Sequence, residues 1–188
     1  MNTTIKNRQA VRSLCEGAIM IALAEILSFI PLYKMPWGGA IDLAMLPVFV
    51  FCARWGFGPG MLVSVAHAIL QTLFEGGIAI GWQSIVGDFL LAYSVLGIAG
   101  LFRKVKGGYY FGTLIGCTAR FLVLYVVGAT IWAEYMPEVF FSMTMTTPWI
   151  YSALYNGAYM VPDCILCLLV GWLLMKTPAK KYLIPYQE

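Results

Sequence analysis

The chain has 188 residues, of which 61% are hydrophobic and 11% are charged, with a formal net charge of +3. That composition and a mean hydropathy of +0.80 exclude an ordinary soluble domain and indicate an integral membrane protein. The small net charge gives no reason to expect a nucleic-acid partner, and no glycine-rich phosphate-binding motif occurs, so ATP hydrolysis is not expected of this chain. At roughly 20 residues per span, its length suits one bundle of about six spans.

The first span is expected over residues 12–30. The polar start before it has no signal-peptide cleavage site, so we expect the span to be retained. Ala18 and Ala22 lie one helical turn apart, a spacing of small residues that lets another membrane helix approach closely. Of its two glutamates, Glu16 can reach the interface, whereas Glu25 is deeper and should face protein.

The second and third spans are expected over 41–53 and 61–74. The second is short and is interrupted by Pro47, and a turn-rich connection with Trp37 precedes it. An aromatic residue at a span end is typical of a membrane interface. His67, the single histidine, is more simply explained as a hydrogen-bonded packing residue than as a ligand-binding group.

The fourth span, over 80–102, carries Asp88 about one turn into an otherwise uncharged run. Ionisable groups at that depth are costly and usually face protein or a substrate path, which makes Asp88 a candidate binding residue. The fifth span, over 110–132, carries Arg120. This cation can pair with Asp88, or it can instead satisfy carbonyls and head groups at one end of the bundle. The sixth span covers 148–175.

The basic residues indicate the orientation. With an even number of spans, all lysines and arginines except Lys34 and Arg120 fall on one side, which the positive-inside rule makes the cytoplasm. The predicted fold class is therefore an all-α integral membrane protein, a six-transmembrane-helix bundle in one membrane domain (1–188) with both termini cytoplasmic. The cysteines lie in apolar runs, and the pair Cys164 and Cys167 has no second pair to complete a metal site, so we expect packing and no metal or cofactor.

Polar and aromatic residues gather in the outer halves of the last spans. They are Asp88, Phe89, Trp132, Tyr151 and Asn156, with Trp37 and Trp82 nearby. A carboxylate, an amide, a phenol and flat aromatic faces suit a small, planar, nitrogen-rich ligand. The alternative is an aromatic belt at the membrane interface with one satisfied asparagine, and residue spacing does not separate the two interpretations.

The stretches 87–93 and 96–103 resemble the fourth-span signature of the thiamine-specific substrate-binding (S) components of energy-coupling factor (ECF) transporters. The likeness continues at 36–40, at 46–47, at Gly128 with Trp132, and at 151–157, and it covers nearly the whole chain. It implies a six-helix subunit in a prokaryotic plasma membrane that captures thiamine from outside. It also implies partners, a transmembrane coupling protein and two cytoplasmic ATPases, and no enzymatic activity of its own.

The same resemblance implies site roles for individual residues. Asp88 corresponds to the acidic pyrimidine reader, Trp132 to the stacking tryptophan and Trp37 to the outer-loop tryptophan. Tyr151 and Asn156 correspond to the polar groups of the sixth span, and Gly128 belongs to the shared pattern. Ala18 and Ala22 correspond to the face that meets the coupling protein.

Three positions depart from the family pattern. Asp88 is shorter than the glutamate that the family often has, Phe89 replaces a common tyrosine, and Leu124 replaces a histidine expected four residues before Gly128. The pyrimidine end of a ligand is thus better supported than the thiazolium end, which keeps hydroxymethylpyrimidine or another vitamin open. An ion-coupled carrier and an intramembrane enzyme are the alternatives from other classes. For an enzyme, the sequence shows neither a paired carboxylate nor a zinc motif.

Overall fold

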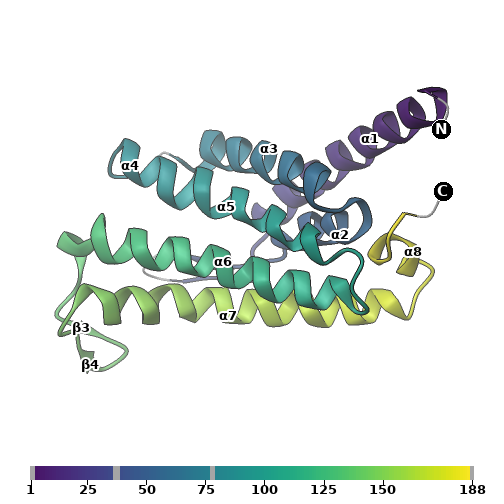
Figure 1. Ribbon diagram of the computed structural model, residues 1–188. Coiled ribbons are helices and arrows are strands. Elements are labelled where there is room, and N and C mark those ends of the chain that lie inside the picture. Colours follow the sequence, from purple (N-terminus) through teal and green to yellow (C-terminus); the bar gives the residue numbers. More distant parts are fainter. Residues whose placement is uncertain (1–2, 36–38, 77–78, 187–188) are drawn as a thin grey trace.

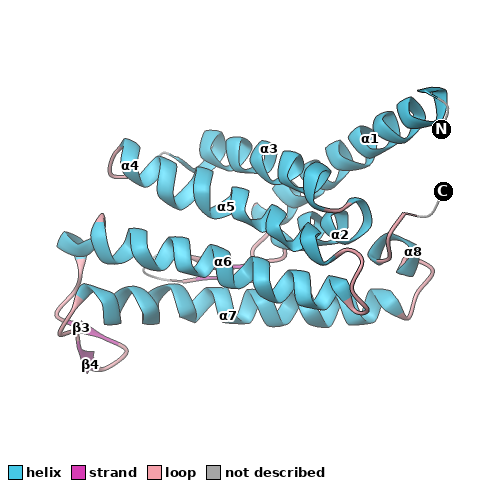
Figure 2. Ribbon diagram, in the orientation of Figure 1, coloured by secondary structure: helices cyan, strands magenta, loops and turns pink. Residues whose placement is uncertain are grey.

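The structure is a computed structural model that describes residues 3–35, 39–76 and 79–186, so Trp37 lies outside the described residues. The chain is mostly helical (Figure 2). The helices are α1 (Thr3–Ser28), α2 (Met45–Trp55), α3 (Phe57–Glu75), α4 (Trp82–Ser84), η2 (Ile85–Leu91), α5 (Ala92–Ser94), η3 (Val95–Phe102), α6 (Gly108–Thr130), η4 (Ala133–Tyr135), α7 (Pro148–Met175) and α8 (Lys180–Leu183). Two antiparallel hairpins, β1 (Tyr33–Lys34) with β2 (Ala40–Ile41) and β3 (Val139–Phe140) with β4 (Met143–Thr144), lie in connections.

The long helices form one bundle (Figure 1). α6 and α7 run side by side in opposite directions, and the continuous stretch from α4 to η3 packs against α6 and α3. Both chain termini lie at one end of the bundle, which we call the terminal end, and the β3–β4 hairpin lies at the other, which we call the hairpin end. α1 leans away from the bundle toward the terminal end.

α2 is the centre of the bundle. Its 11 residues are apolar on all sides except at Arg54, and nearly all of them are buried. A helix that is hydrophobic all round is stable only when other elements surround it, and α1, α3, η3, α6 and α8 do so here. At a rise of about 1.5 Å per residue the helix is about 16 Å long, well short of a bilayer core.

Within the described ranges, four helical segments are long and apolar enough to cross a membrane: α3, 82–102, α6 and α7. The segment expected over 148–175 is α7, with the same bounds, whereas the one expected over 41–53 is the shorter, buried α2. α1 is long enough but carries several charges, and it is not among the four.

The stretch 82–102 is not the uniform helix that the sequence suggests. η2 is a π-helix around Asp88, and η3 is a 3₁₀-helix. Gly100 explains why η3 comes so close to its neighbours, because a Cβ there would lie 2.5 Å from the carbonyl carbon of Gly56 and 2.6 Å from the nitrogen of Phe57. Gly56 itself has a φ of 86°, which favours glycine in this turn between α2 and α3.

Gly100→Ala is expected to destabilise the protein strongly. The atoms that the new methyl group meets belong to backbone, which cannot rotate away, so we expect overpacking to cost about 3 kcal/mol. The measurement is the melting temperature of the purified chain in detergent. Gly58→Ala is the matched control, because nothing lies within 4 Å of a Cβ at Gly58; equal melting temperatures for the two variants would contradict this packing.

A polar cluster ties the C-terminal tail to α1 and α2 at the terminal end. Glu16 accepts hydrogen bonds from Arg54 Nε at 2.7 Å, from Trp55 Nε1 at 2.8 Å and from Arg12 Nε at 3.0 Å. Arg54 also donates to the carbonyl oxygen of Lys181. The ring of Tyr186 stacks on Trp55 with centroids 4.8 Å apart, and Arg12 donates to its hydroxyl group. The tail is therefore part of the folded bundle.

Candidate functional site

Asp88 lies in η2, where the wide π-helical turn presents its carboxylate to the end of α6. Its Oδ2 accepts two hydrogen bonds, from Ser84 Oγ at 2.6 Å and from Trp132 Nε1 at 2.7 Å. π-Helical turns inside longer helices are frequent at functional sites, because the extra residue re-aims a side chain. The structure thus brings together Asp88 and Trp132, the two residues on which the sequence-based site depends most.

Tyr151 forms an aromatic wall with residues that precede and follow it. Its ring packs edge-on against Phe140, with centroids 5.1 Å apart, and lies 5.7 Å from the ring of Tyr155. Phe140 belongs to strand β3 and is only 7% exposed although it lies in a connection. The hairpin therefore covers the start of α7, where Tyr151 lies.

Asn156 is buried and makes its hydrogen bonds within the protein. Its Nδ2 donates to the carbonyl oxygens of Ser152, at 3.0 Å, and Leu124, at 3.3 Å, and its Oδ1 accepts from Tyr159 at 2.6 Å. These contacts join α6 to α7. Asn156 and Leu124 thus lie together at the contact between the two helices, and the side chain of Leu124 is itself buried.

Gly128 permits the close approach of α6 and α7 at this level. A Cβ there would lie 2.4 Å from Ser152 Oγ and 3.2 Å from Asn156 Nδ2. Phe89, next to Asp88, is half-buried and packs against the main hydrophobic core. Trp82, in contrast, is 70% exposed and contributes no wall to this arrangement.

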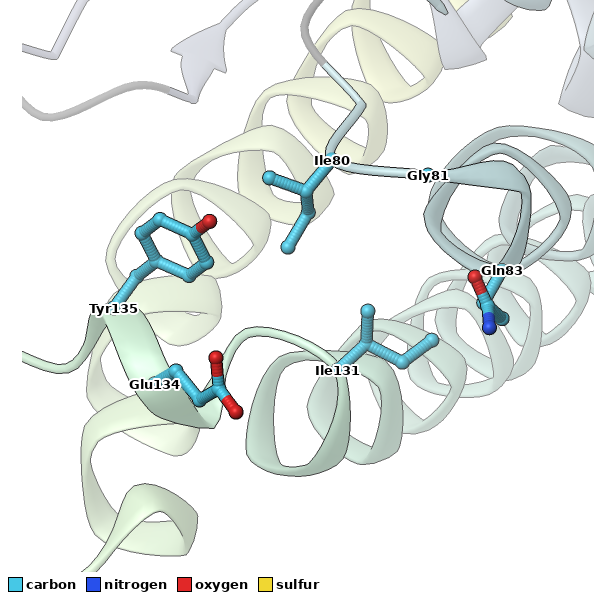
Figure 3. Close-up of a pocket in the computed structure, with 6 residues that line it drawn as sticks. All are labelled: Ile80, Gly81, Gln83, Ile131, Glu134 and Tyr135. Carbon is cyan, nitrogen blue, oxygen red and sulfur yellow. The ribbon is translucent and has the colours of Figure 1, made fainter.

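A cavity of about 360 Å³ opens at the hairpin end between α4 and η4 (Figure 3). Its lining residues are Ile80, Gly81, Gln83, Ile131, Glu134 and Tyr135. Tyr135 packs edge-on against Trp132, with ring centroids 5.8 Å apart, so the cavity adjoins the Asp88–Trp132 contact. A second cavity, of about 560 Å³, lies beside α7 and includes Tyr33 of β1 and Phe141 after β3. The first is the size of a small-molecule site.

Arg120 does not pair with Asp88 among the residues that the structure describes. It is 8% exposed, and its guanidinium carbon lies 3.9 Å from the centroid of the Tyr93 ring. Asp42, Asp163 and Glu75 are among the carboxylates within its electrostatic range. The two expectations for Arg120 were pairing with Asp88, or reaching head groups or carbonyls at one end of the bundle, and neither describes its position over an aromatic ring.

The sequence-based site omitted several residues that complete the arrangement. Ser84 lies one helical turn before Asp88, and Tyr159 lies three residues after Asn156, so helical spacing could have identified both. Phe140 gave no such signal, because its place depends on a hairpin that brings a loop residue over α7.

Ala18 and Ala22 lie exposed on α1, whereas Gly17 is buried on a different side of the helix. A Cβ on Gly17 would come within 2.9 Å of Val63 in α3. The two alanines are therefore on a face of α1 that this chain leaves uncovered, and their role in binding a partner stays a prediction.

Fold and apolar helices define a multi-pass helical protein of the prokaryotic plasma membrane, and comparisons with known proteins agree. Residues 14–183 match the model of the family described as thiamine transporter protein. The chain belongs to this thiamine transporter protein family.

Relatives named thiamine transporter ThiT include one from Bacillus subtilis (strain 168), 30% identical over 187 residues, covering 92% of this chain and 94% of that protein. Another, from Lacticaseibacillus paracasei, is 27% identical and covers 87% of each chain. The solved structure of ThiT from Listeria monocytogenes has the same fold, with a TM-score of 0.79 and 24% identity, over 93% of this chain and 98% of that one. The two relatives are named transporters, not enzymes.

Proposed function

We propose that this chain is the substrate-binding subunit of an ECF vitamin transporter and captures thiamine from outside the cell. The observation that carries the proposal is the half-buried Asp88 carboxylate near the hairpin end, which Ser84 and Trp132 hold at 2.6 and 2.7 Å. Both donors bind Oδ2, which leaves Oδ1 as the oxygen for a donor on the pyrimidine ring or its amine. A fixed carboxylate in a half-buried site is a strong partner for such a group.

The remaining site residues would hold the rings of the ligand. Trp132 lies beside the carboxylate, and Tyr151 presents an aromatic face from α7, so both are placed to stack on a planar ring or to bind a thiazolium cation. Gly128 would keep the α6 wall close to α7, and Phe89 would add apolar surface. Asn156, already bonded to Tyr159 and Ser152, would act at the floor.

The charge distribution supports six spans with both termini in the cytoplasm. The basic residues Lys104, Lys106, Lys176, Lys180 and Lys181 are exposed. They follow the ends of the helices that point to the terminal end, whereas Glu134 and Glu138 lie in the connection at the hairpin end. By the positive-inside rule the terminal end then faces the cytoplasm and the site faces outward.

Energy for transport would come from partners. The uncovered face of α1 with Ala18 and Ala22 suits close packing against a transmembrane coupling protein. Two cytoplasmic ATPases would complete the assembly.

Uptake of labelled thiamine into vesicles tests the need for partners. The chain alone should bind thiamine but not accumulate it, and ATP-dependent accumulation should require the partners. Accumulation by the chain alone would favour a self-contained carrier.

The ligand is tested by calorimetric titration of the purified chain. Thiamine should bind one to one without ATP, and hydroxymethylpyrimidine, the second candidate, should compete. An absence of heat with either compound in the folded protein would contradict the proposed ligand class. The second candidate is favoured by one observation: the buried Leu124 offers no polar side chain to the part of the ligand beyond the pyrimidine.

Leu124→His is expected to raise the preference for thiamine over hydroxymethylpyrimidine by about 10-fold. An imidazole can hydrogen-bond or stack where the leucine cannot, and one charged or well-aligned hydrogen bond is worth about 1.5 kcal/mol. The measurement is the ratio of the two dissociation constants. Leu124→Met, which adds no polar group, is the matched control, and an unchanged ratio in Leu124→His would place this position away from the ligand.

A further inference from the structure

A buried polar group joins α1 to α3 and does not include the candidate site residues. His67 and Gln71 of α3 are both 0% exposed, and Glu25 of α1 is 7% exposed. The two oxygens of Glu25 are 2.7 Å from His67 Nδ1 and 3.0 Å from Gln71 Nε2. Burying a carboxylate is costly unless it keeps its partners, so α1 cannot slide along α3 at this level without losing them.

Tyr93 connects this group to α6. The imidazole of His67 meets the ring of Tyr93 edge-on, with centroids 5.1 Å apart and planes at 85°. The guanidinium of Arg120 lies 3.9 Å from the centroid of the same ring. Tyr93 is 8% exposed and therefore cannot move without disturbing the imidazole, the guanidinium or both.

From Tyr93 and Arg120 the series continues to Asn156, the proposed floor of the ligand site. Tyr93 and Tyr159 belong to the same buried hydrophobic core as Arg120's neighbour Leu124, and the Tyr159 hydroxyl donates to Asn156 at 2.6 Å. Tyr93 also shares one continuous helical stretch with Asp88, five residues before it. The interior side chains therefore form a series from α1, through α3, α5 and α6, to α7, whose last step runs through the shared hydrophobic core.

Two members of the series, and Gln71 Oε1 beside them, lack a hydrogen-bond partner among the described residues, which makes the series sensitive to small shifts. His67 Nε2 and Arg120 Nε are buried and have no hydrogen-bond partner among the described residues. Their environment is then supplied chiefly by the Tyr93 ring, through ring-edge and cation–π contacts. A displacement of Tyr93 changes the stabilisation of both at once.

We propose that Glu25, His67 and Tyr93 are positioning residues that couple the placement of α1 to the floor of the ligand site. The proposal rests on the proposed function, since α1 carries the face expected to meet the coupling protein. Binding of a ligand at Asp88 fixes the 82–102 stretch and hence Tyr93, and the series carries that constraint to Glu25. The placement of α1 that the coupling protein meets would in this way depend on whether a ligand is bound.

The test is a double-mutant cycle in the dissociation constant for thiamine, measured by tryptophan fluorescence on the full chain. The variants are Glu25→Gln, which removes the charge and keeps the shape, and Tyr93→Leu, which removes the ring. Mutations in packed networks change the coupling between sites by about 2- to 30-fold in a dissociation constant. The change in dissociation constant for the double variant should therefore differ from the product of the two single changes by at least about 3-fold. Tyr93→Phe, which keeps the ring, should retain most of the coupling.

Glu16→Gln is the matched control, because it makes the same substitution on the same helix outside the series. Paired with Tyr93→Leu, it should act independently on thiamine affinity, whatever it does to the melting temperature. If Tyr93→Leu does not fold, His67→Leu takes its place in the cycle. If Glu25→Gln and the second substitution of the cycle changed thiamine affinity independently, the inference would be overturned. A wild-type chain that does not bind thiamine would instead overturn the proposed function.

Discussion

Asp88→Asn is expected to weaken thiamine binding by about 10- to 100-fold. A hydrogen bond to a charged group contributes about 1.5–3 kcal/mol, and each 1.4 kcal/mol is a factor of ten in affinity. The amide oxygen can still accept from Ser84 and Trp132, as the carboxylate does at 2.6 and 2.7 Å. The amide then turns an NH₂ group toward the ligand amine, so donor meets donor.

The measurement is the dissociation constant from calorimetry or tryptophan quenching, with the melting temperature recorded for each variant. Glu138→Gln removes the same charge from an exposed position in the connection before β3 and should leave affinity unchanged. If Asp88→Asn bound thiamine as tightly as the wild-type chain, Asp88 would be a structural residue that holds Trp132 and nothing more.

Asp88 also shows how far sequence reasoning reaches in this chain. A single carboxylate in a long apolar run must find partners: Asp88 accepts from Trp132, and Glu25 faces protein as expected. The role of Asp88 in ligand binding stays a prediction. Likewise the lone histidine was expected to be a hydrogen-bonded packing residue, and His67 bonds to Glu25. Such inferences succeed because burial without a partner is costly wherever the residue lies in the fold.

Inference fails where position depends on three-dimensional packing. Arg120 was expected to pair with Asp88 or to reach head groups or carbonyls at one end of the bundle, but it lies over the ring of Tyr93, which sequence spacing alone could not identify. Nor could periodicity predict the π-helical turn at Asp88, because the pattern of apolar residues is nearly the same for α- and π-helical turns. The two hairpins are only two residues per strand, below what alternation can reveal.

The terminal end carries the second large effect, because there a buried cation holds three parts of the chain. The side chain of Arg54 is 7% exposed, and it pairs with Glu16 at 2.7 Å, whose side chain is 16% exposed. Arg54 also donates to the carbonyl of Lys181 in α8. Removing one partner of a buried ion pair is far more damaging than removing both, since the other charge remains buried without compensation.

Arg54→Met is therefore expected to destabilise the protein by about 3 kcal/mol, because it leaves Glu16 with Trp55 and the more exposed Arg12. The measurement is the melting temperature in detergent, which should fall sharply, while thiamine affinity well below that temperature stays near wild type because the site is at the opposite end. Arg54→Lys should recover part of the loss by restoring the charge without the bidentate geometry.

Lys104→Met provides the control for a lost positive charge at the same end, since Lys104 is exposed and surface substitutions usually change stability by less than about 0.5 kcal/mol. If Arg54→Met and Lys104→Met had the same melting temperature, the cluster of Glu16, Trp55 and Tyr186 would be held by its stacked rings alone. If it instead lowered thiamine affinity at temperatures where the chain is folded, the two ends of the bundle would be coupled through α2. α2 contacts η3, α6 and α7, so it offers a route from the tail to the site that avoids Glu25 and His67, beside the hydrogen bond that Arg103 donates to the carbonyl oxygen of Tyr186.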